Sequence, residues 1–354
     1  MLNSHLTGVR LDRPDDIVRW HGVMQAQDYG PAKWSVGQRS TGLLDGDLDR
    51  ALETGSIVRT HVLRPTWHFA ARDDIRWLLA LTGPRVQRHN ARRYDELGLD
   101  GATRSRCEAL IASALESGNR LTRAEIGRIV QEGGVDAAGQ RLPYIIMHCE
   151  LESVICSGGR AGSQHTYALM DERVPGPHHR FDREEALVTL VRRYLGSHGP
   201  ATVKDLRWWS SLTVADINKG LTLLGTEVES RAVDGLTLWA LATDVASGSA
   251  QRRAHLLQAY DELIVGYTES RFFGDRLAAS ASATWKNRSL PTGVVIIGSE
   301  VAGHWKRTVK KASVAVEVVT YELPKPRDAQ AVEAAAENLG RFLNRQVTVE
   351  VRQI

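Results

Sequence analysis

Apolar and polar residues in the first 95 positions follow a pattern that predicts three helices and then a β-hairpin. Apolar residues at helical spacing give way to β-branched residues at strand spacing. The predicted elements are helices over 14–24, 32–39 and about 47–54 and strands over 57–60 and 66–70, with a turn at 63–65. Three helices closed by a hairpin are the winged-helix plan.

One more helix is predicted after this hairpin, over residues 73–82. Gly83-Pro84 is expected to end it, because proline lacks the N–H that a continuing helix needs. We therefore assign residues 1–95 to a first winged-helix unit.

The same order of elements recurs in residues 96–178 and 179–250. A threonine followed three positions later by an acidic residue, the capping-box pattern, starts the second helix of each repeat. Glycine-containing turns mark both hairpins. The elements are helices over 104–116, 142–151, 183–195 and 212–224, short helices after Thr122 and Thr202, and hairpins over 154–169 and 228–241. Three winged-helix units in tandem are the expected arrangement.

The remaining residues, 251–354, have a different character. Apolar stretches predict a small antiparallel sheet with one long helix before its last strand. The strands are expected over 294–297, 301–308, 314–321 and 347–349, and the helix over 329–343. The predicted fold class is therefore α+β, with three winged-helix units and a β-rich C-terminal scaffold. The sequence has no P-loop, dinucleotide fingerprint or Gly-x-Ser-x-Gly motif.

Composition excludes several classes of protein. The hydrophobic content of 42% and charged content of 25% are ordinary for a globular chain. No apolar run approaches the ~20 residues that span a bilayer, and no signal sequence precedes the first helix, so we expect a cytoplasmic protein without a membrane partner. Cys107, Cys149 and Cys156 lack metal-ligand spacing and are expected to be buried. We expect neither a metal nor a cofactor.

Positive charge is clustered although the net charge is only +3. Arginines at helical spacing follow Gly83-Pro84, and a second cluster lies near residue 307. Such patches are often only solvated faces, but two of them make a phosphate backbone a reasonable partner. The clustered residues are Arg85, Arg88, Arg92 and Arg93 in the first patch and Lys306, Arg307, Lys310 and Lys311 in the second.

Two glutamines, Gln25 and Gln27, lie between the first two predicted helices. Pro31 follows shortly after, and a residue before proline favours extended geometry. In an extended segment, residues two apart share a face, so both amides would point into one space with Ala26 turned away. The alternative is a polar loop in which the amides cap nearby backbone.

Four motifs make the chain similar to a known family. They are His61-Val-Leu-Arg-Pro-Thr-Trp-His-Phe69, Leu151-Glu-Ser-Val-Ile-Cys-Ser-Gly158, Ser197-His-Gly-Pro-Ala-Thr202 and Tyr260-Asp-Glu262. Together they resemble the winged-helix DNA glycosylase superfamily over nearly the whole chain. The catalytic signature Gln-Φ-Gln, in which Φ is apolar, fits Gln25-Ala26-Gln27 and is typical of the AlkZ-like branch. A sibling branch has aspartate at the second polar position.

This resemblance implies a monomeric, C-shaped molecule that clasps double-stranded DNA. It implies monofunctional excision of bulky N7-alkylguanine, in base excision repair or antibiotic self-resistance, and in some members the unhooking of interstrand crosslinks. Gln25 and Gln27 would be catalytic. Asp28, which the motif does not require, is a candidate proton acceptor.

The resemblance also suggests which residues bind DNA. Candidates are His61, Arg64 and His68 on the first hairpin, Arg160 at the second hairpin's tip, the first patch with Arg85, Arg88 and Arg92, and Lys306 and Arg307. For each, a packing or surface role is the alternative, and Trp67, Asp261 and Glu262 are interpreted as structural. The alternative function is a winged-helix transcriptional regulator, which normally dimerises on spaced half-sites.

Overall fold

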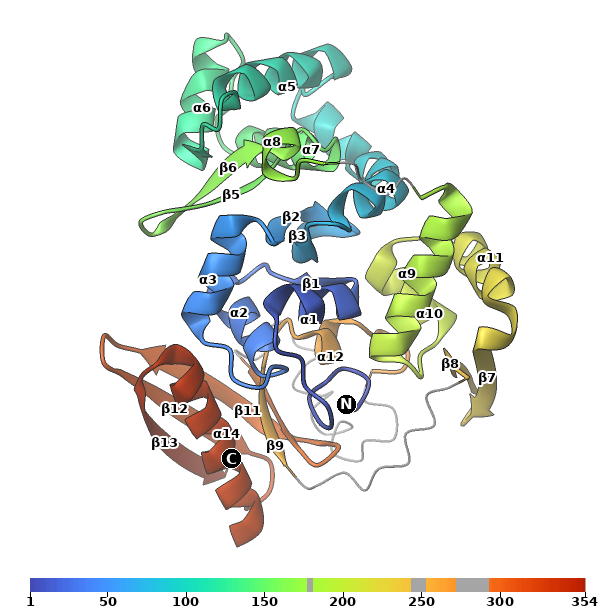
Figure 1. The fold of residues 1–354 in the computed structure, drawn as a ribbon, viewed down its shortest axis with the longest axis vertical. Coiled ribbons are helices and arrows are strands. Elements are labelled where there is room, and N and C mark those ends of the chain that lie inside the picture. The colour runs from blue at the N-terminus through green and yellow to red at the C-terminus, as the bar shows by residue number, and fades with distance from the viewer. Residues whose placement is uncertain (177–180, 243–252, 272–292, 354) are drawn as a thin grey trace.

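The computed structural model describes residues 1–176, 181–242, 253–271 and 293–353, and its fold is α+β. We refer to residues 1–95, 96–178, 179–250 and 251–354 as the first, second, third and C-terminal segments. Figure 1 shows the first segment in the middle of the molecule, with the second and C-terminal segments at opposite ends and the third beside it. No helix in the described residues is long and apolar enough to cross a membrane.

The first segment contains the predicted helices and hairpin and one additional strand. The elements are α1 (Pro14–His21), β1 (Val23–Gln25), α2 (Tyr29–Gly37), α3 (Asp45–Thr54), β2 (Ile57–Val62), β3 (Arg64–Ala71) and α4 (Ile75–Glu96). The first helix ends three residues earlier than predicted, because Gly22 adopts a φ of 78° and turns the chain into β1. β1 pairs antiparallel with β3, in a sheet of order β1-β3-β2.

The second and third segments repeat this order. The second has α5 (Gly101–Leu115), β4 (Leu121–Thr122), α6 (Arg123–Glu132), α7 (Arg141–Leu151), β5 (Ile155–Ala161), β6 (Gln164–Leu169) and α8 (Met170–Arg173). The third has α9 (Arg183–His198), α10 (Val203–Ser210), α11 (Val214–Leu224), β7 (Val228–Val233) and β8 (Leu236–Leu241). Both predicted capping boxes are present, at Thr122 and Thr202. Each segment therefore has the element order that the winged-helix prediction requires.

A short extended stretch before the second helix recurs in all three segments. β1 pairs with β3 in the first segment and β4 with β6 in the second, while Ala201 forms a single bridge with Trp239 of β8 in the third. The glutamine motif thus begins on a strand that belongs to the repeated plan.

The prediction that a helix ends at Gly83-Pro84 is wrong. α4 continues unbroken to Glu96 with Pro84 inside it, so the first arginine patch lies on the same helix as the apolar residues before it. Burial of apolar residues on both sides of the proline outweighs the lost hydrogen bond. A Cβ atom at Gly83 would lie only 3.0 Å from the Leu151 carbonyl oxygen, so this glycine permits close packing on α7.

The C-terminal sheet is mixed rather than purely antiparallel. Its order is β13-β12-β11-β10-β9, and β12 and β13 are parallel. The crossover helix α14 connects those two strands, as parallel pairing requires. The elements are β9 (Ala254–Gln258), α12 (Glu262–Val265), β10 (Gly293–Ile297), β11 (Glu300–Val309), β12 (Ser313–Thr320), α14 (Pro326–Leu343) and β13 (Gln346–Gln353).

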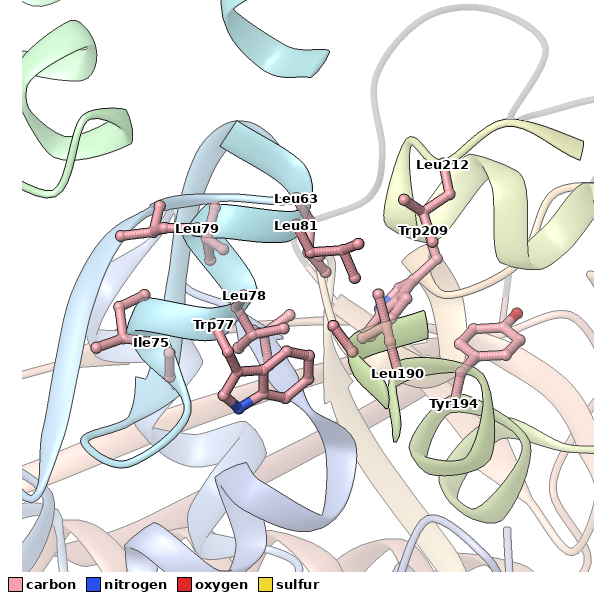
Figure 2. Packing of buried hydrophobic residues seen from close by; sticks show 14 of the residues in the cluster. Leu63, Ile75, Trp77, Leu78, Leu79, Leu81, Leu190, Tyr194, Trp209 and Leu212 are labelled. Carbon is pink, nitrogen blue, oxygen red and sulfur yellow. The ribbon is translucent and has the colours of Figure 1, made fainter. Parts of the chain in front are cut away.

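Hydrophobic cores join the segments to one another. One core unites the first hairpin and α4 with α9, α10 and α11. Figure 2 shows Trp77 and Leu81 of α4 on one side and Leu190, Tyr194 and Trp209 of the third segment on the other. A second core joins α1, α2 and α3 to the C-terminal sheet. The three cysteines are buried as predicted.

Candidate active site

Gln25 is the last residue of the edge strand β1. It lies opposite His68 of β3, and the register continues through Ala26, whose N–H donates to the Trp67 carbonyl oxygen at 2.7 Å. Gln25 is therefore extended, as predicted, whereas Gln27 lies in a bend beyond the end of the strand. Gln25 is 9% exposed, and its side-chain oxygen has no hydrogen-bond partner within the described residues. This oxygen can accept a hydrogen bond from the substrate or from a water molecule.

Gln27 lies just beyond the end of β1 and is exposed. Its Oε1 accepts a hydrogen bond from the Thr66 hydroxyl at 2.8 Å, which orients the amide and leaves a second lone pair for another donor. Ala26, between the two glutamines, is fully buried. Both glutamines therefore lie beside β3: Gln25 is opposite His68, and Gln27 is bonded to Thr66.

Arg59 of β2 holds the backbone of the motif. Its guanidinium donates to the carbonyl oxygens of Ala26 at 2.9 Å and Gln27 at 3.2 Å, and it lies 4.5 Å from the centre of a Trp67 ring. A planar guanidinium that bonds two successive carbonyls fixes both peptide planes. Arg59 is thus a positioning residue for the glutamines.

Asp28 directly precedes α2 at the N-cap position. Thr122 and Thr202 occupy the N-cap positions of α6 and α10 and cap them with their side chains, whereas the Asp28 carboxylate makes no capping hydrogen bond. Asp28 is also exposed. Its carboxylate is therefore free to accept a proton beside the motif, which keeps it a candidate.

Asp261 and Glu262, the two acidic residues of the fourth motif, have different surroundings. Asp261 is a structural residue: its oxygens accept from Arg39 at 2.6 and 2.8 Å and from Ser35 at 2.7 Å in a fully buried cluster. Glu262 instead touches the motif, because its Oε1 accepts from the Gln25 N–H at 2.6 Å. The sequence interpretation of this pair as a structural corner is incomplete for Glu262.

A basic groove lies between α4 and α10, and its lining includes Arg64 and Pro65 of β3, the two residues before Thr66. It has a volume of about 790 Å³, and its walls combine cations with an exposed tryptophan. The guanidinium of Arg64 lies 5.8 Å from the centre of the Trp208 ring, and its Nε and one terminal nitrogen have no hydrogen-bond partner within the described residues. The basic side chains of the lining are Arg64, Arg85, Arg88, His89, Lys204 and Arg207.

The other predicted DNA contacts lie in several places. Arg160 of the second hairpin lies 5.2 Å from the ring centre of Tyr29, next to Asp28. Arg307 of β11 lies close to Gly30, the residue after Tyr29. A Cβ atom placed on Gly30 would be 3.7 Å from the Arg307 guanidinium. Arg92 is highly exposed on α4 but is paired with Glu96 and is outside the groove lining, and Lys306 is paired with Glu317.

Two of the predicted contacts are interior residues in the structure. His61 is 5% exposed, and its ring is bonded to the buried carboxylate of Glu150. His68 is fully buried, and burial, together with the nearby Arg64, lowers its pKa to about 3. The sequence prediction that both lie on the DNA surface is therefore not met. A neutral His68 instead faces Gln25 across the strand pair.

Residues 18–342 match the family model described as "DNA glycosylase AlkZ-like". The chain belongs to the AlkZ-like DNA glycosylase family. It is therefore a DNA glycosylase, and its substrate is DNA.

Two similar proteins are known from Streptomyces sahachiroi. An interstrand DNA cross-link repair glycosylase is 25% identical over 353 residues, which cover 92% of this chain and 90% of the relative. The solved structure of the DNA glycosylase AlkZ has a TM-score of 0.75 at 20% identity and covers 99% of this chain and 97% of that one. The second comparison supports the fold of this AlkZ-like glycosylase.

Several residues of the candidate site could have been predicted from the sequence but were not. Lys204, Arg207 and Trp208 lie on α10 and line the groove. Their spacing on one capped helix was a usable signal, because positions three or four apart share a face. The contacts of Arg59 and Glu262 with the motif gave no such signal, since they join residues from distant parts of the chain.

Proposed function

We propose that this glycosylase hydrolyses the N-glycosidic bond of bulky N7-alkylguanine, with Gln25 and Gln27 as its catalytic residues. The observation that carries the proposal is the motif's geometry. The Gln25 amide is buried at the end of β1, and its oxygen has no hydrogen-bond partner within the described residues, whereas the Gln27 amide is exposed and bonded to Thr66 of the paired strand β3. Thr66, which bonds the Gln27 amide, directly follows Arg64 and Pro65 of the basic groove.

The chemistry of the lesion suits two neutral amides. An N7-alkylated guanine is already cationic and departs as a neutral base, so no general acid is required. The remaining tasks are to place a water molecule at the anomeric carbon and to stabilise a sugar with oxocarbenium character. Amide oxygens accept a hydrogen bond from the water and direct their dipoles toward positive charge. The proton of the attacking water passes to Asp28 or to solvent.

The basic groove is proposed as the path of the DNA backbone. Arg64, Arg85, Arg88 and Arg207 would neutralise phosphates on one side of the motif, and Arg160 and Arg307 on the other. These cations come from all four segments of the chain. That distribution supports a monomer that surrounds duplex DNA, rather than a dimer reading spaced half-sites.

We further propose that crosslinked guanines are substrates. A crosslinked base is tied to the opposite strand and resists full extrusion into a pocket, which is the usual route of base-modifying enzymes. Gln27 and Asp28 are exposed, so an open site reached along the DNA surface would avoid this problem. The similar glycosylase of S. sahachiroi is named for interstrand cross-link repair. A role in repair or in self-resistance to an alkylating antibiotic follows from such an activity.

The test is an excision assay on duplexes that carry N7-methylguanine, a bulky N7 adduct or an N7-linked crosslink. Abasic sites are converted to strand breaks and resolved on a gel. We expect cleavage of the N7 adducts without a lyase product, since the mechanism uses no lysine nucleophile. No cleavage of any adduct, together with tight sequence-specific binding of undamaged DNA, would favour the transcriptional regulator instead.

A further inference from the structure

The carboxylate of Glu262 contacts the backbone of the glutamine motif and lies within hydrogen-bonding distance of three nitrogen atoms. Its Oε1 accepts from the Gln25 N–H at 2.6 Å, and its Oε2 accepts from the indole N–H of Trp209 at 2.9 Å. The Nε2 atom of His198 lies 3.3 Å from the same Oε2. Glu262 is 1% exposed. One buried anion therefore connects the catalytic strand to the ends of α9 and α10.

This carboxylate is ionised across the working pH range. Burial by itself raises the pKa of Glu262, but the hydrogen bond and electrostatic interaction with His198 and the hydrogen bond from the Gln25 N–H outweigh it and lower the pKa to about 2. The neighbouring imidazoles of His21 and His68 are neutral, because burial lowers the pKa of each to about 3. Those two rings therefore add no positive charge beside Glu262, and the basic groups that interact with it are His198 and Arg64.

In the proposed reaction the sugar becomes positively charged, and the neutral amides of Gln25 and Gln27 can stabilise that charge only through their dipoles. We propose that Glu262 is the fixed negative charge that stabilises this cationic sugar, acting from behind β1 through its field and its bond to the Gln25 backbone. It is a positioning residue and does not touch the substrate. This assignment rests on the proposed function, because it concerns the transition state of that reaction.

No proton passes through Glu262 in this scheme. The C1′–N9 bond breaks with both electrons going to the cationic base, which leaves neutral. Water forms the new C1′–O bond and gives its proton to Asp28 or to solvent. Glu262 remains an anion throughout, and its contribution is greatest when the sugar is most positive.

The size of the effect follows from the geometry. A sugar reached by the Gln25 side chain would lie about 6 to 8 Å from the carboxylate, where two unit charges at an effective dielectric constant of about 20 change an equilibrium constant by about 30- to 100-fold. A neutral sugar analogue in the same place would feel almost none of this. The difference between a cationic and a neutral analogue therefore isolates charge from structure.

The experiment compares two duplexes that carry stable abasic analogues at the target position. One holds a pyrrolidine, whose protonated ring nitrogen mimics the cationic sugar, and the other holds a neutral tetrahydrofuran. Dissociation constants for both are measured with the full-length protein and with Glu262→Gln. The matched control is Glu150→Gln, since Glu150 is also a fully buried carboxylate bonded to a histidine.

We expect the wild type and Glu150→Gln to prefer the pyrrolidine duplex, and Glu262→Gln to lose this preference by about 30- to 100-fold. Glu262→Asp, which keeps the charge, should retain most of it. If Glu262→Gln is too unstable, Glu262→Ala provides the same comparison. An unchanged preference in the neutral variants would overturn the role of Glu262 while leaving the proposed function intact. A wild type without excision activity and without preference would overturn both.

Discussion

The basic groove makes a quantitative prediction about salt. Replacing Arg85, Arg88 and Arg207 together by alanine removes three cations from its walls without touching the glutamine motif. Each phosphate contact contributes about 0.9 to the slope of log K against log salt concentration, so the triple variant should lose about 2.7 from that slope. Between about 50 and 200 mM salt, the wild type should therefore weaken about 40-fold more than the variant.

The assay is fluorescence anisotropy with a labelled duplex at several salt concentrations. Arg183→Ala is the matched control, because Arg183 is an exposed arginine of α9 that is paired with Asp216 and is not part of the groove lining. The single-turnover excision rate at saturating protein should change little in the triple variant. A triple variant with the slope of the wild type would place the DNA elsewhere on the molecule and refute the groove assignment.

Three further predictions concern the groove and the stability of the site. If a DNA base stacks on the Trp208 ring, Trp208→Ala should weaken DNA binding by about 1 kcal/mol or more. Trp20→Ala, at the exposed tryptophan of α1, should leave binding unchanged, and fluorescence anisotropy measures both variants. Between pH 7 and pH 5, His21 and His68 should each lower the free energy of unfolding by about 1 to 2 kcal/mol. The reason is that burial lowers the pKa of both histidines to about 3, so over this pH range only the unfolded state gains a proton on them. Urea titrations at both pH values test this, and an unchanged free energy of unfolding would contradict it. Asp261→Ala should cost about 3 to 5 kcal/mol in the same assay, because Arg39 would remain buried without its partner, and a loss below about 1 kcal/mol would argue against that cluster as a stabilising element.

Local sequence signals predicted most of the elements of this fold. The capping boxes at Thr122 and Thr202 and the turn at Asp234-Gly235 involve residues a few positions apart, so the sequence carries them directly. The error at Pro84 has a different origin, because the helix is maintained by apolar burial against α7 and α9, which no local pattern reveals. The parallel pairing of β12 with β13 likewise depends on how α14 crosses the sheet.

The site shows the same division. The extended geometry of Gln25 agrees with the prediction, but Pro31 is not its cause, because Gly30 before that proline lies inside α2; pairing of β1 with β3 holds Gln25 extended. Its supporting residues could not be predicted from the sequence, because Glu262 lies 237 positions from Gln25 in the chain and meets it only in the folded protein. Histidines of the first hairpin show the converse: motif resemblance suggested a surface role, but the fold buries His61 and His68.

The most direct test of the account is single-turnover excision of N7-methylguanine by Gln25→Ala, Gln27→Ala and Asp28→Asn, with DNA binding measured in parallel. Loss of an oriented dipole should lower the excision rate of each glutamine variant by roughly one to three orders of magnitude, with binding little changed. Asp28→Asn should have a smaller effect, because solvent can take the proton. If Asp28→Asn alone abolishes turnover while both glutamine variants remain active, the two-amide mechanism is wrong.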